Sequence, residues 1–185
     1  MNAFRKQIDV LTREVDNIEM RSRRKMLLLH GVPEQQGEVT AQVVVDLVKK
    51  QLQLDDFKLN NIRRSRRMGR SAGVNKPRPI LIKVDTVALR DKIWSSKTKF
   101  KGTGKTWSEF LTRDRHQVFM LARERFGVTK SWTREGHIYV LDSEGTQHRV
   151  VSLAELNKLN DDSAKTSAAA KAAPKTRRGA ASKKQ

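Results

Sequence analysis

The sequence predicts an α+β protein, and three observations carry this prediction. Apolar residues near the N-terminus recur at helical spacing, apolar strands alternate with amphipathic helices through the middle, and the last residues have no apolar period. We expect a coiled-coil helix over residues 1–22, a mixed domain over 23–111, a small α+β domain over 112–159 and a disordered basic tail over 160–185.

The first expected element is an amphipathic helix. Its apolar residues step by four and three and form a heptad seam, while charged residues fill the other faces. The seam consists of Phe4, Ile8, Leu11, Val15 and Ile18. About two heptads are present, fewer than a secure coiled coil needs, and an isolated helix this short is marginal in water. We therefore expect the seam either to pack on its own domain or to associate with copies of itself.

A basic junction separates this helix from the first expected strand. Four cations, Arg21, Arg23, Arg24 and Lys25, directly precede the apolar run Met26–His30. Gly and Pro follow the run and signal a turn. This pattern predicts a basic hinge that leads into the first strand of a domain and places positive charge at the mouth of a binding module.

Helices and strands then alternate. We expect a helix from Thr40 to about Leu54 and a second strand over Phe57–Ile62, where apolar residues alternate. A third strand over Ile80–Val84, a helix over Val87–Ser96 and a fourth strand over Thr106–Leu111 follow. The order strand, helix, strand, strand, helix, strand is the split β-α-β pattern of the ferredoxin-like class, which includes RNA-recognition modules (RRM-type domains).

A smaller unit follows. Apolar residues of a helical face end at Gly127, strands are expected at Trp132, over Ile138–Leu141 and over His148–Val151, and a short apolar helix completes the unit. The basic stretch Lys175–Lys184 then has the composition of a nuclear-import signal or of additional phosphate affinity, or else is a disordered end without a role.

The charge balance points to an anionic partner. The chain has 185 residues, of which 39 are Lys or Arg and 20 are Asp or Glu, so its formal charge is +19 and its pI about 10.7. A domain this basic has the usual electrostatic footprint of nucleic-acid binding. A membrane surface is the rival, but no apolar run approaches the roughly 18 residues that a spanning helix needs. The N-terminus does not resemble a signal peptide, so we expect no membrane partner and a location in cytoplasm and nucleus.

Positive charge concentrates in the middle of the chain. Over residues 58–105 there are 15 Lys or Arg against two Asp, a net charge of +13. Because side chains two apart on a strand share a face, Arg64 and Arg66 can line one side together, and Lys83 should point outward with Leu81. Guanidinium groups bind phosphates bidentately. The candidate nucleic-acid contacts are Arg21, Arg23, Arg24, Lys25, Arg63, Arg64, Arg66, Arg67, Arg70 and Lys83.

Four aromatic residues are candidates for stacking on bases, namely Phe100, Trp107, Trp132 and Tyr139. Core packing is the alternative role for each tryptophan. The first and third expected strands carry aliphatic residues, His30 and Lys83 where RNA-recognition modules place an aromatic pair. We therefore expect backbone charge to outweigh base reading, with weak sequence selectivity.

An ordered set of segments resembles a known family. The run Arg-Ser-Arg-Arg at residues 21–24, an apolar strand and Gly-Val-Pro-Glu at 31–34 resemble the junction of coiled coil and RNA-recognition domain in first-open-reading-frame proteins of LINE-type retrotransposons. Residues 78–84 look like the third strand of that domain, and residues 113–159 are similar to the small C-terminal domain. The baculovirus few-polyhedra protein and its insect relatives look still closer in length and basic tail.

The resemblance implies a trimeric or otherwise oligomeric coiled coil, binding of single-stranded RNA and DNA, and chaperone-like strand annealing without turnover. It also implies that Arg113 and Arg115, at the start of the C-terminal domain, join the nucleic-acid contacts. The coiled coil of this chain is much shorter than that of the family.

The sequence offers no catalytic site. The segment from Gly102 to Thr106 suggests a phosphate loop, but Lys99 stands where a P-loop needs glycine. The four histidines have no metal-ligand spacing, and without cysteine there are no disulfides, Cys-containing zinc sites or thiol nucleophiles. We expect a non-enzymatic binder of single-stranded nucleic acid with no cofactor and no metal. The alternative is a structural interaction protein of a viral or retroelement particle.

Overall fold

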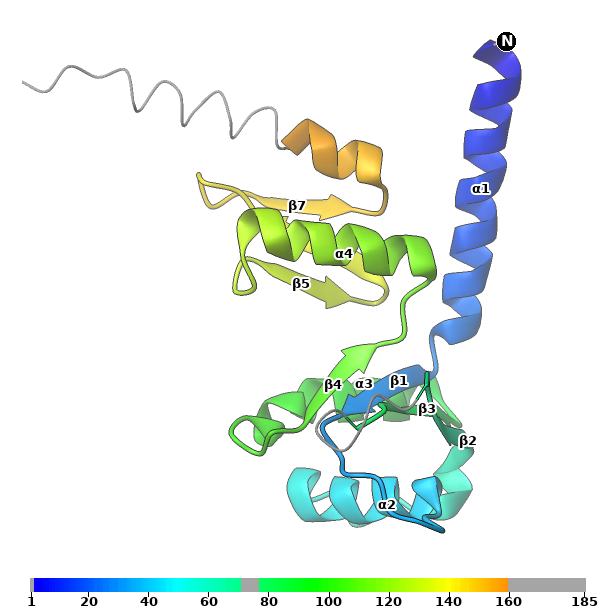
Figure 1. The fold of residues 1–185 in the computed structure, drawn as a ribbon, viewed down its shortest axis with the longest axis vertical. Coiled ribbons are helices and arrows are strands. Elements are labelled where there is room, and N and C mark those ends of the chain that lie inside the picture. Colours follow the sequence, from blue (N-terminus) through cyan, green and yellow to red (C-terminus); the bar gives the residue numbers. More distant parts are fainter. Residues whose placement is uncertain (1, 71–76, 160–185) are drawn as a thin grey trace, which may run out of the picture. The chain divides into compact units, whose positions relative to one another are not determined.

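The computed structural model describes residues 2–70 and 77–159, which form an α+β structure with an N-terminal helix and two antiparallel sheets (Figure 1). The chain divides into two compact units. The first contains the residues up to Gln117 together with Thr133–His137, and the second contains Val118–Trp132 and the residues from Ile138 onward. The α+β class is therefore confirmed. The expected tail over 160–185, like residues 71–76, lies outside the described residues.

Helix α1 runs over Asn2–Arg23 and so includes part of the expected hinge. Arg21 and Arg23 lie in its last turn, where cations interact favourably with the negative end of the helix dipole. Arg24 and Lys25 form the turn to the first strand. The expected hinge is thus two residues long, because the helix continues through the basic run.

The first unit contains a four-stranded sheet with the order β2-β3-β1-β4, in which all neighbouring strands are antiparallel. The strands are β1 (Met26–His30), β2 (Ile62–Arg67), β3 (Ile80–Val84) and β4 (Thr106–Glu109). Helix α2 (Thr40–Leu47), extended by a π-helical segment (η1, Val48–Leu52), connects β1 to β2. Helix α3 (Val87–Ser95), extended by a 3₁₀ segment (η3, Ser96–Phe100), connects β3 to β4.

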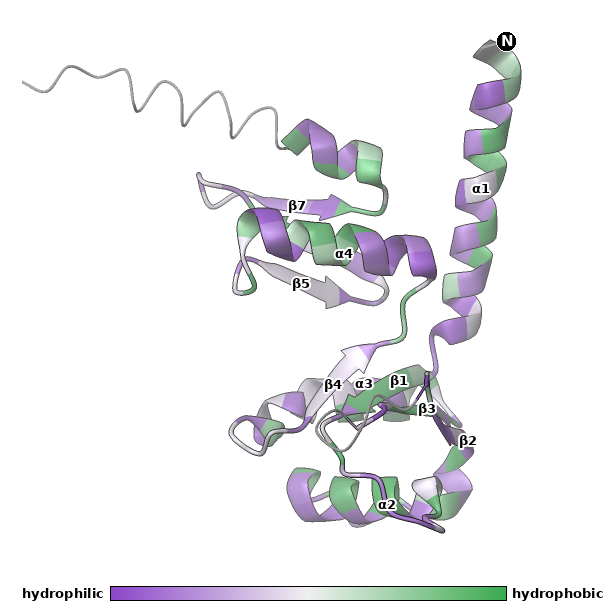
Figure 2. Ribbon diagram, in the orientation of Figure 1, coloured by the Kyte–Doolittle hydropathy of each residue, from purple (hydrophilic) through white to green (hydrophobic). Residues whose placement is uncertain are grey.

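One face of this sheet forms the main core. Alternate apolar side chains of β1 and β3, such as Leu27 and Ile82, are fully buried and pack with Val44 of α2 and Ile93 of α3. In Figure 2, β1 is hydrophobic, whereas α1 shows hydrophilic and hydrophobic residues along its whole length. Both connecting helices therefore cover the same face of the sheet, and the residues between the buried ones lie on the opposite face.

The second strand begins later than the sequence predicted. Phe57 is buried in the preceding loop, Leu59–Asn61 form a short 3₁₀ turn (η2), and β2 covers the arginine-rich run from Ile62 to Arg67. The expected strand over Phe57–Ile62 is therefore wrong. The apolar alternation there reflects loop residues that fill the core, whereas pairing with β3 turns a highly charged segment into a strand.

Gly31 ends β1 in a place that suits glycine alone. Its φ is +78°, and a Cβ there would lie 2.1 Å from the carbonyl oxygen of Gly104 in the turn before β4. Any side chain at position 31 would force these two backbone segments apart.

The second unit has its own core. Helix α4 (Arg113–Phe126) and a helical segment over residues 153–159 pack on a sheet with the order β5-β6-β7. The strands are β5 (Ser131–Arg134), β6 (His137–Leu141) and β7 (Gln147–Val150). The core residues are Val118, Ala122, Ile138, Val140, Val150 and Leu156. As predicted, Gly127 ends the helix, with φ +92° and its amide donating to the Arg123 carbonyl.

The turn between β6 and β7 is stabilised by a carboxylate. Asp142 accepts hydrogen bonds from the amides of Glu144 (2.9 Å) and Thr146 (2.8 Å) and pairs with His148 at 2.8 Å. The His148 contact and these amides lower the pKa of Asp142. The antiparallel pairing of β6 with β7 makes this turn the tip of a hairpin.

Candidate nucleic-acid interface

Strand β2 brings cations onto the face opposite α2 and α3. Its register pairs Arg64 with Lys83 and Arg66 with Leu81 on β3. Because directly opposed residues share a face, Arg64, Arg66 and Lys83 lie together there, as the strand period predicted. Both arginines are exposed and Lys83 is half-buried.

Lys25 lies beside this group, in the turn before β1. Its carbonyl accepts the Val84 amide at 3.0 Å, and its ammonium donates to the Asp85 carbonyl at 2.9 Å. Met26, the residue after it, is the one that pairs with Lys83, so Lys25 is not counted on this face. We call Arg64, Arg66 and Lys83 the cationic row.

The charges of the cationic row are uncompensated. Like charges directly across a strand pair are destabilising, and Arg64 stands opposite Lys83. Within the described part of the chain, Arg64, Arg66 and Lys83 have no ion-pair partner. Such a cluster can bind an anion without first breaking an internal salt bridge.

Arg67, the next residue along β2, has a different role. Its guanidinium pairs with Glu38 through both carboxylate oxygens, at 2.6 and 2.9 Å, and donates to the carbonyls of Val32, Pro33 and Arg78. The Arg67 side chain is 6% exposed, and its hydrogen bonds lower the pKa of Glu38. Arg67 is therefore part of the fold and is removed from the candidate contacts.

Arg115 is removed for the same reason. Its side chain is 2% exposed and pairs with Asp16 of α1 at 2.6 Å. It also donates to the Asn17 side chain (2.7 Å) and the Gly136 carbonyl (2.9 Å). The expectation that Arg115 contacts nucleic acid does not fit this burial, since all three of its guanidinium nitrogens already donate to groups within the fold.

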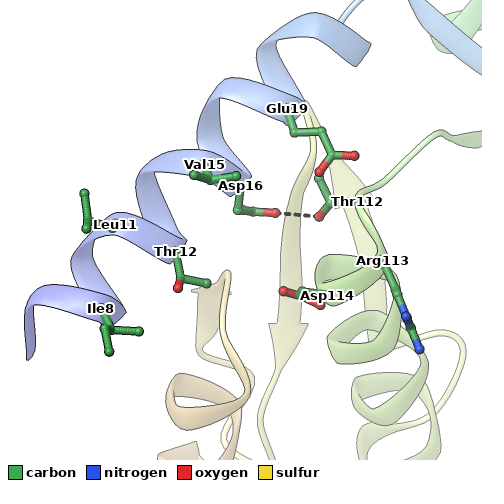
Figure 3. A pocket seen from close by; sticks show the side chains of 9 residues that line it. All are labelled: Ile8, Leu11, Thr12, Val15, Asp16, Glu19, Thr112, Arg113 and Asp114. Atoms are coloured by element: carbon green, nitrogen blue, oxygen red, sulfur yellow. Dashed lines mark hydrogen bonds between the residues drawn. The ribbon is translucent and has the colours of Figure 1, made fainter. Parts of the chain in front are cut away.

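Figure 3 shows a neighbouring contact of α1, between Asp16 and Thr112. Asp16 points toward Thr112, whose hydroxyl donates to it at 2.5 Å, while Leu11 points away. A hollow beside these residues is lined by Ile8, Leu11, Thr12, Val15, Asp16, Glu19, Thr112, Arg113 and Asp114. The apolar seam is not covered by the protein itself, since all five seam residues are between 58% and 74% exposed.

Three further candidates are partly engaged. Arg23 pairs with Glu19 and lies 4.1 Å from the Phe110 ring centroid. Arg24 lies 3.4 Å from carboxylates of Asp91 and Glu135. The third is Arg63, which pairs with Asp85 at 2.6 Å but is 67% exposed. An exposed pair of this kind is worth little and exchanges easily for a phosphate.

The remaining candidates are separate from the cationic row. Arg21 lies at the end of α1, Arg70 follows β2, and Arg113 opens α4. All three are exposed, and no contact among the described residues joins them to the row.

Ion pairs neutralise other cations of the basic middle segment. Glu34 binds Arg78 through two carboxylate oxygens, which lowers the Glu34 pKa to about 2. Arg90 of α3 is buried and pairs with Glu109 of β4. The sequence did not indicate these partners, because Glu34 and Glu109 lie 44 and 19 residues from the arginines that they bind. Glu34 follows the turn predicted at Gly31 and Pro33, which is a signal that could have pointed to it, whereas Glu109 lies within a strand and carried no such signal.

The cationic row has a histidine as neighbour on β1. His30 Nε2 lies 2.7 Å from the Ser108 hydroxyl, and burial together with the charge of His116 lowers the His30 pKa. His30 is therefore neutral near pH 7, and the charge of this face comes from lysine and arginine.

Two of the expected stacking residues are unavailable. Phe100 and Trp107 are 1% and 3% exposed and contact each other edge to face in the main core, with centroids 6.1 Å apart. Their expected role as base-stacking platforms is wrong, because β4 pairs Trp107 with Leu29 on the core side. Trp132 and Tyr139 instead stack on each other in the second unit, with centroids 5.9 Å apart and ring planes 11° from parallel.

In comparisons with known proteins, no family model matches the chain, and no curated protein matches its sequence. Among the described residues, no three or more His, Asp or Glu side chains converge as metal ligands. The helices within the described ranges include none that is long and apolar enough to cross a bilayer.

Proposed function

We propose that this protein is a non-enzymatic binder of single-stranded nucleic acid, RNA and also DNA, that acts mainly through phosphate contacts. The observation that carries the proposal is the cationic row, in which Arg64, Arg66 and Lys83 share one sheet face without internal ion pairs. Lysine and arginine on one surface release the counterions of a phosphate backbone, and this drives binding.

The composition of this face supports weak sequence selectivity. The residues of β1 and β3 that share it with Lys83 are Met26, Leu28, His30 and Leu81, none of which is aromatic. Phosphate contacts position a strand but carry no sequence information. We therefore propose binding that depends little on sequence.

We also propose that the first unit is an RRM-type domain. The order β2-β3-β1-β4, with antiparallel neighbours and helices joining β1 to β2 and β3 to β4, supports this interpretation. In such a sheet, the two central strands are β1 and β3, which here hold His30 and Lys83.

Self-association through α1 is the second part of the proposal. The exposed seam, with Leu11 58% and Val15 63% exposed, keeps a heptad spacing that suits copies of the same helix. A trimeric or other oligomeric coiled coil would gather several cationic rows, which supports chaperone-like annealing. Sizing by light scattering tests this: Leu11→Asp with Val15→Asp should give monomers, and an unchanged mass would exclude the seam.

The alternative is a structural interaction protein of a viral or retroelement particle, for which nucleic acid is incidental. The exposed seam favours it as much as it favours a binder. An assembly that persists in high salt after nuclease treatment would support this alternative. Cleavage of RNA in the presence of a divalent metal would instead indicate an enzyme, and we expect intact RNA.

The cationic row can be tested with a matched pair of triple variants. Arg64→Ala, Arg66→Ala and Lys83→Ala together should weaken binding of a labelled oligonucleotide about 10- to 100-fold, since each solvent-exposed charge contact contributes about 0.5–1 kcal/mol. The control, with Ala at Lys49, Lys50 and Lys92, removes equal charge from exposed helix positions. If both triple variants lost the same affinity, net charge alone would matter and the cationic row would be rejected as the binding surface.

A further inference from the structure

The three-stranded sheet of the second unit has a face that its helices do not cover. Ser131 is buried and its hydroxyl donates to the Ala122 carbonyl of α4 at 3.1 Å. Ile138, Val140 and Val150 are buried in the core on the same side. Because strand residues alternate, the side chains between these positions lie on the opposite face.

Three residues on that opposite face form one line across the sheet. Trp132 of β5 stacks on Tyr139 of β6, with ring centroids 5.9 Å apart and planes 11° from parallel. Tyr139 is paired in register with Arg149 of β7. We call Trp132, Tyr139 and Arg149 the aromatic row.

The aromatic row does not belong to the core. Neither ring is a member of the buried cluster of the second unit, both are half-buried, and Arg149 is exposed. Arg149 has no ion-pair partner among the described residues. Lys130, two residues before Trp132, is also exposed. Flat apolar surface is therefore bordered by unpaired positive charge.

We propose that the aromatic row is a second nucleic-acid site, which takes the bases of a single strand by stacking while Arg149 holds an adjacent phosphate. This inference rests on the proposed function, but it assigns different chemistry to a different sheet. Aromatic rings accept any base because every base has a π-face, and a neighbouring cation follows the backbone. The occupant is a single strand and not a duplex, since paired bases have no free face to stack.

A merely structural role is the competing explanation. Cross-strand aromatic pairs stabilise sheets without any ligand. That role requires no cation in the row and predicts that removing the rings leaves base-dependent binding intact. The unpaired Arg149 directly opposite Tyr139 favours the ligand.

The full-length chain and two oligonucleotides of equal length, one oligothymidylate and one abasic, test the inference. The natural protein should prefer the base-bearing strand by roughly tenfold, since a single base stacked on the aromatic row contributes about that factor. Trp132→Leu with Tyr139→Leu should abolish the preference while binding of the abasic strand remains. The control Phe119→Leu, an aromatic loss on the helix side of the same unit, should keep the preference.

The outcomes separate the two proposals. A preserved preference in the double variant overturns the aromatic row and leaves the cationic row intact, whereas failure of the natural protein to bind either strand overturns the proposed function. Photocrosslinking to a strand that contains iodouracil uses the natural protein, so it does not depend on whether the double variant folds. Adducts on Trp132 or Tyr139 support the site, and adducts confined to other residues reject it.

Discussion

The four-stranded and three-stranded sheets expose different chemistry on the faces that their helices leave open. The first presents the cationic row around Arg64 and Lys83, and the second presents Trp132 and Tyr139 beside one arginine. Both sheets use the same construction, in which apolar residues pack against the helices and the alternate, free positions are those on the face that the helices do not cover. The comparison teaches that the free positions decide the type of contact: charge suits phosphates, and rings suit bases.

The same lesson holds within β2. Arg66 and Arg67 are neighbours in sequence, yet they lie on opposite faces of one strand. Arg66 is exposed, while Arg67 is enclosed by Glu38 and three carbonyl groups. A residue type in a basic run therefore says little about its role until its face is known.

The largest expected effect concerns these two arginines. Arg67→Met should lower the free energy of unfolding by about 3–5 kcal/mol, because it leaves Glu38 and three carbonyls without a buried partner. Arg66→Met, which removes an exposed charge, should change it by less than about 0.5 kcal/mol. Urea denaturation of both variants measures the difference. If the two values were equal, β2 would not separate structural from ligand-binding arginines as described.

Salt dependence should distinguish the two sheet faces. Each phosphate contact on a single strand contributes about 0.7 to the slope of log affinity against log salt concentration. Removing Arg64, Arg66 and Lys83 should make that slope shallower by about 2, whereas the leucine variants of Trp132 and Tyr139 should leave it unchanged. Titrations at several salt concentrations provide the slopes. If the leucine variants changed the salt slope, the assignment of phosphate contacts to one sheet and base stacking to the other would be wrong.

The smallest effect concerns pH. The His30 pKa in the folded state lies below its ordinary value of 6.5, chiefly because of burial and then because of His116. The unfolded chain therefore binds this proton more tightly, so the stabilisation is complete above pH 6.5 and is lost as pH falls through the folded pKa. Melting temperatures should fall between pH 7 and 5, and less so in His30→Gln. An identical fall in both proteins would assign the change to other groups.

Much of the first unit could be predicted from local sequence. The strands Met26–His30 and Ile80–Val84 match β1 and β3, since buried central strands carry continuous apolar runs that turn signals delimit. The strand period predicted that Arg64 and Arg66 share a side and that Lys83 points outward, but the pairing of β2 with β3 was needed to bring the three together. The position of β2 was not predicted correctly, because apolar residues at Phe57 and Leu59 imitate strand alternation in a loop.

Other features needed long-range contacts. Arg115 meets Asp16, which is 99 residues away, and Arg67 meets Glu38, which is 29 residues away. No local period encodes such a partner, so both arginines looked like free cations. The stacking of Trp132 on Tyr139 likewise depends on the register of two strands.

The sequence by itself determined the excess of positive charge, the heptad seam of α1, the order of helices and strands, and which strand residues alternate. Tertiary structure alone decided which cations are buried in ion pairs and which aromatic rings remain outside the cores. The physical reason is that composition and periodicity act over a few neighbouring residues. Burial and electrostatic pairing, in contrast, depend on segments that meet only when the chain is folded.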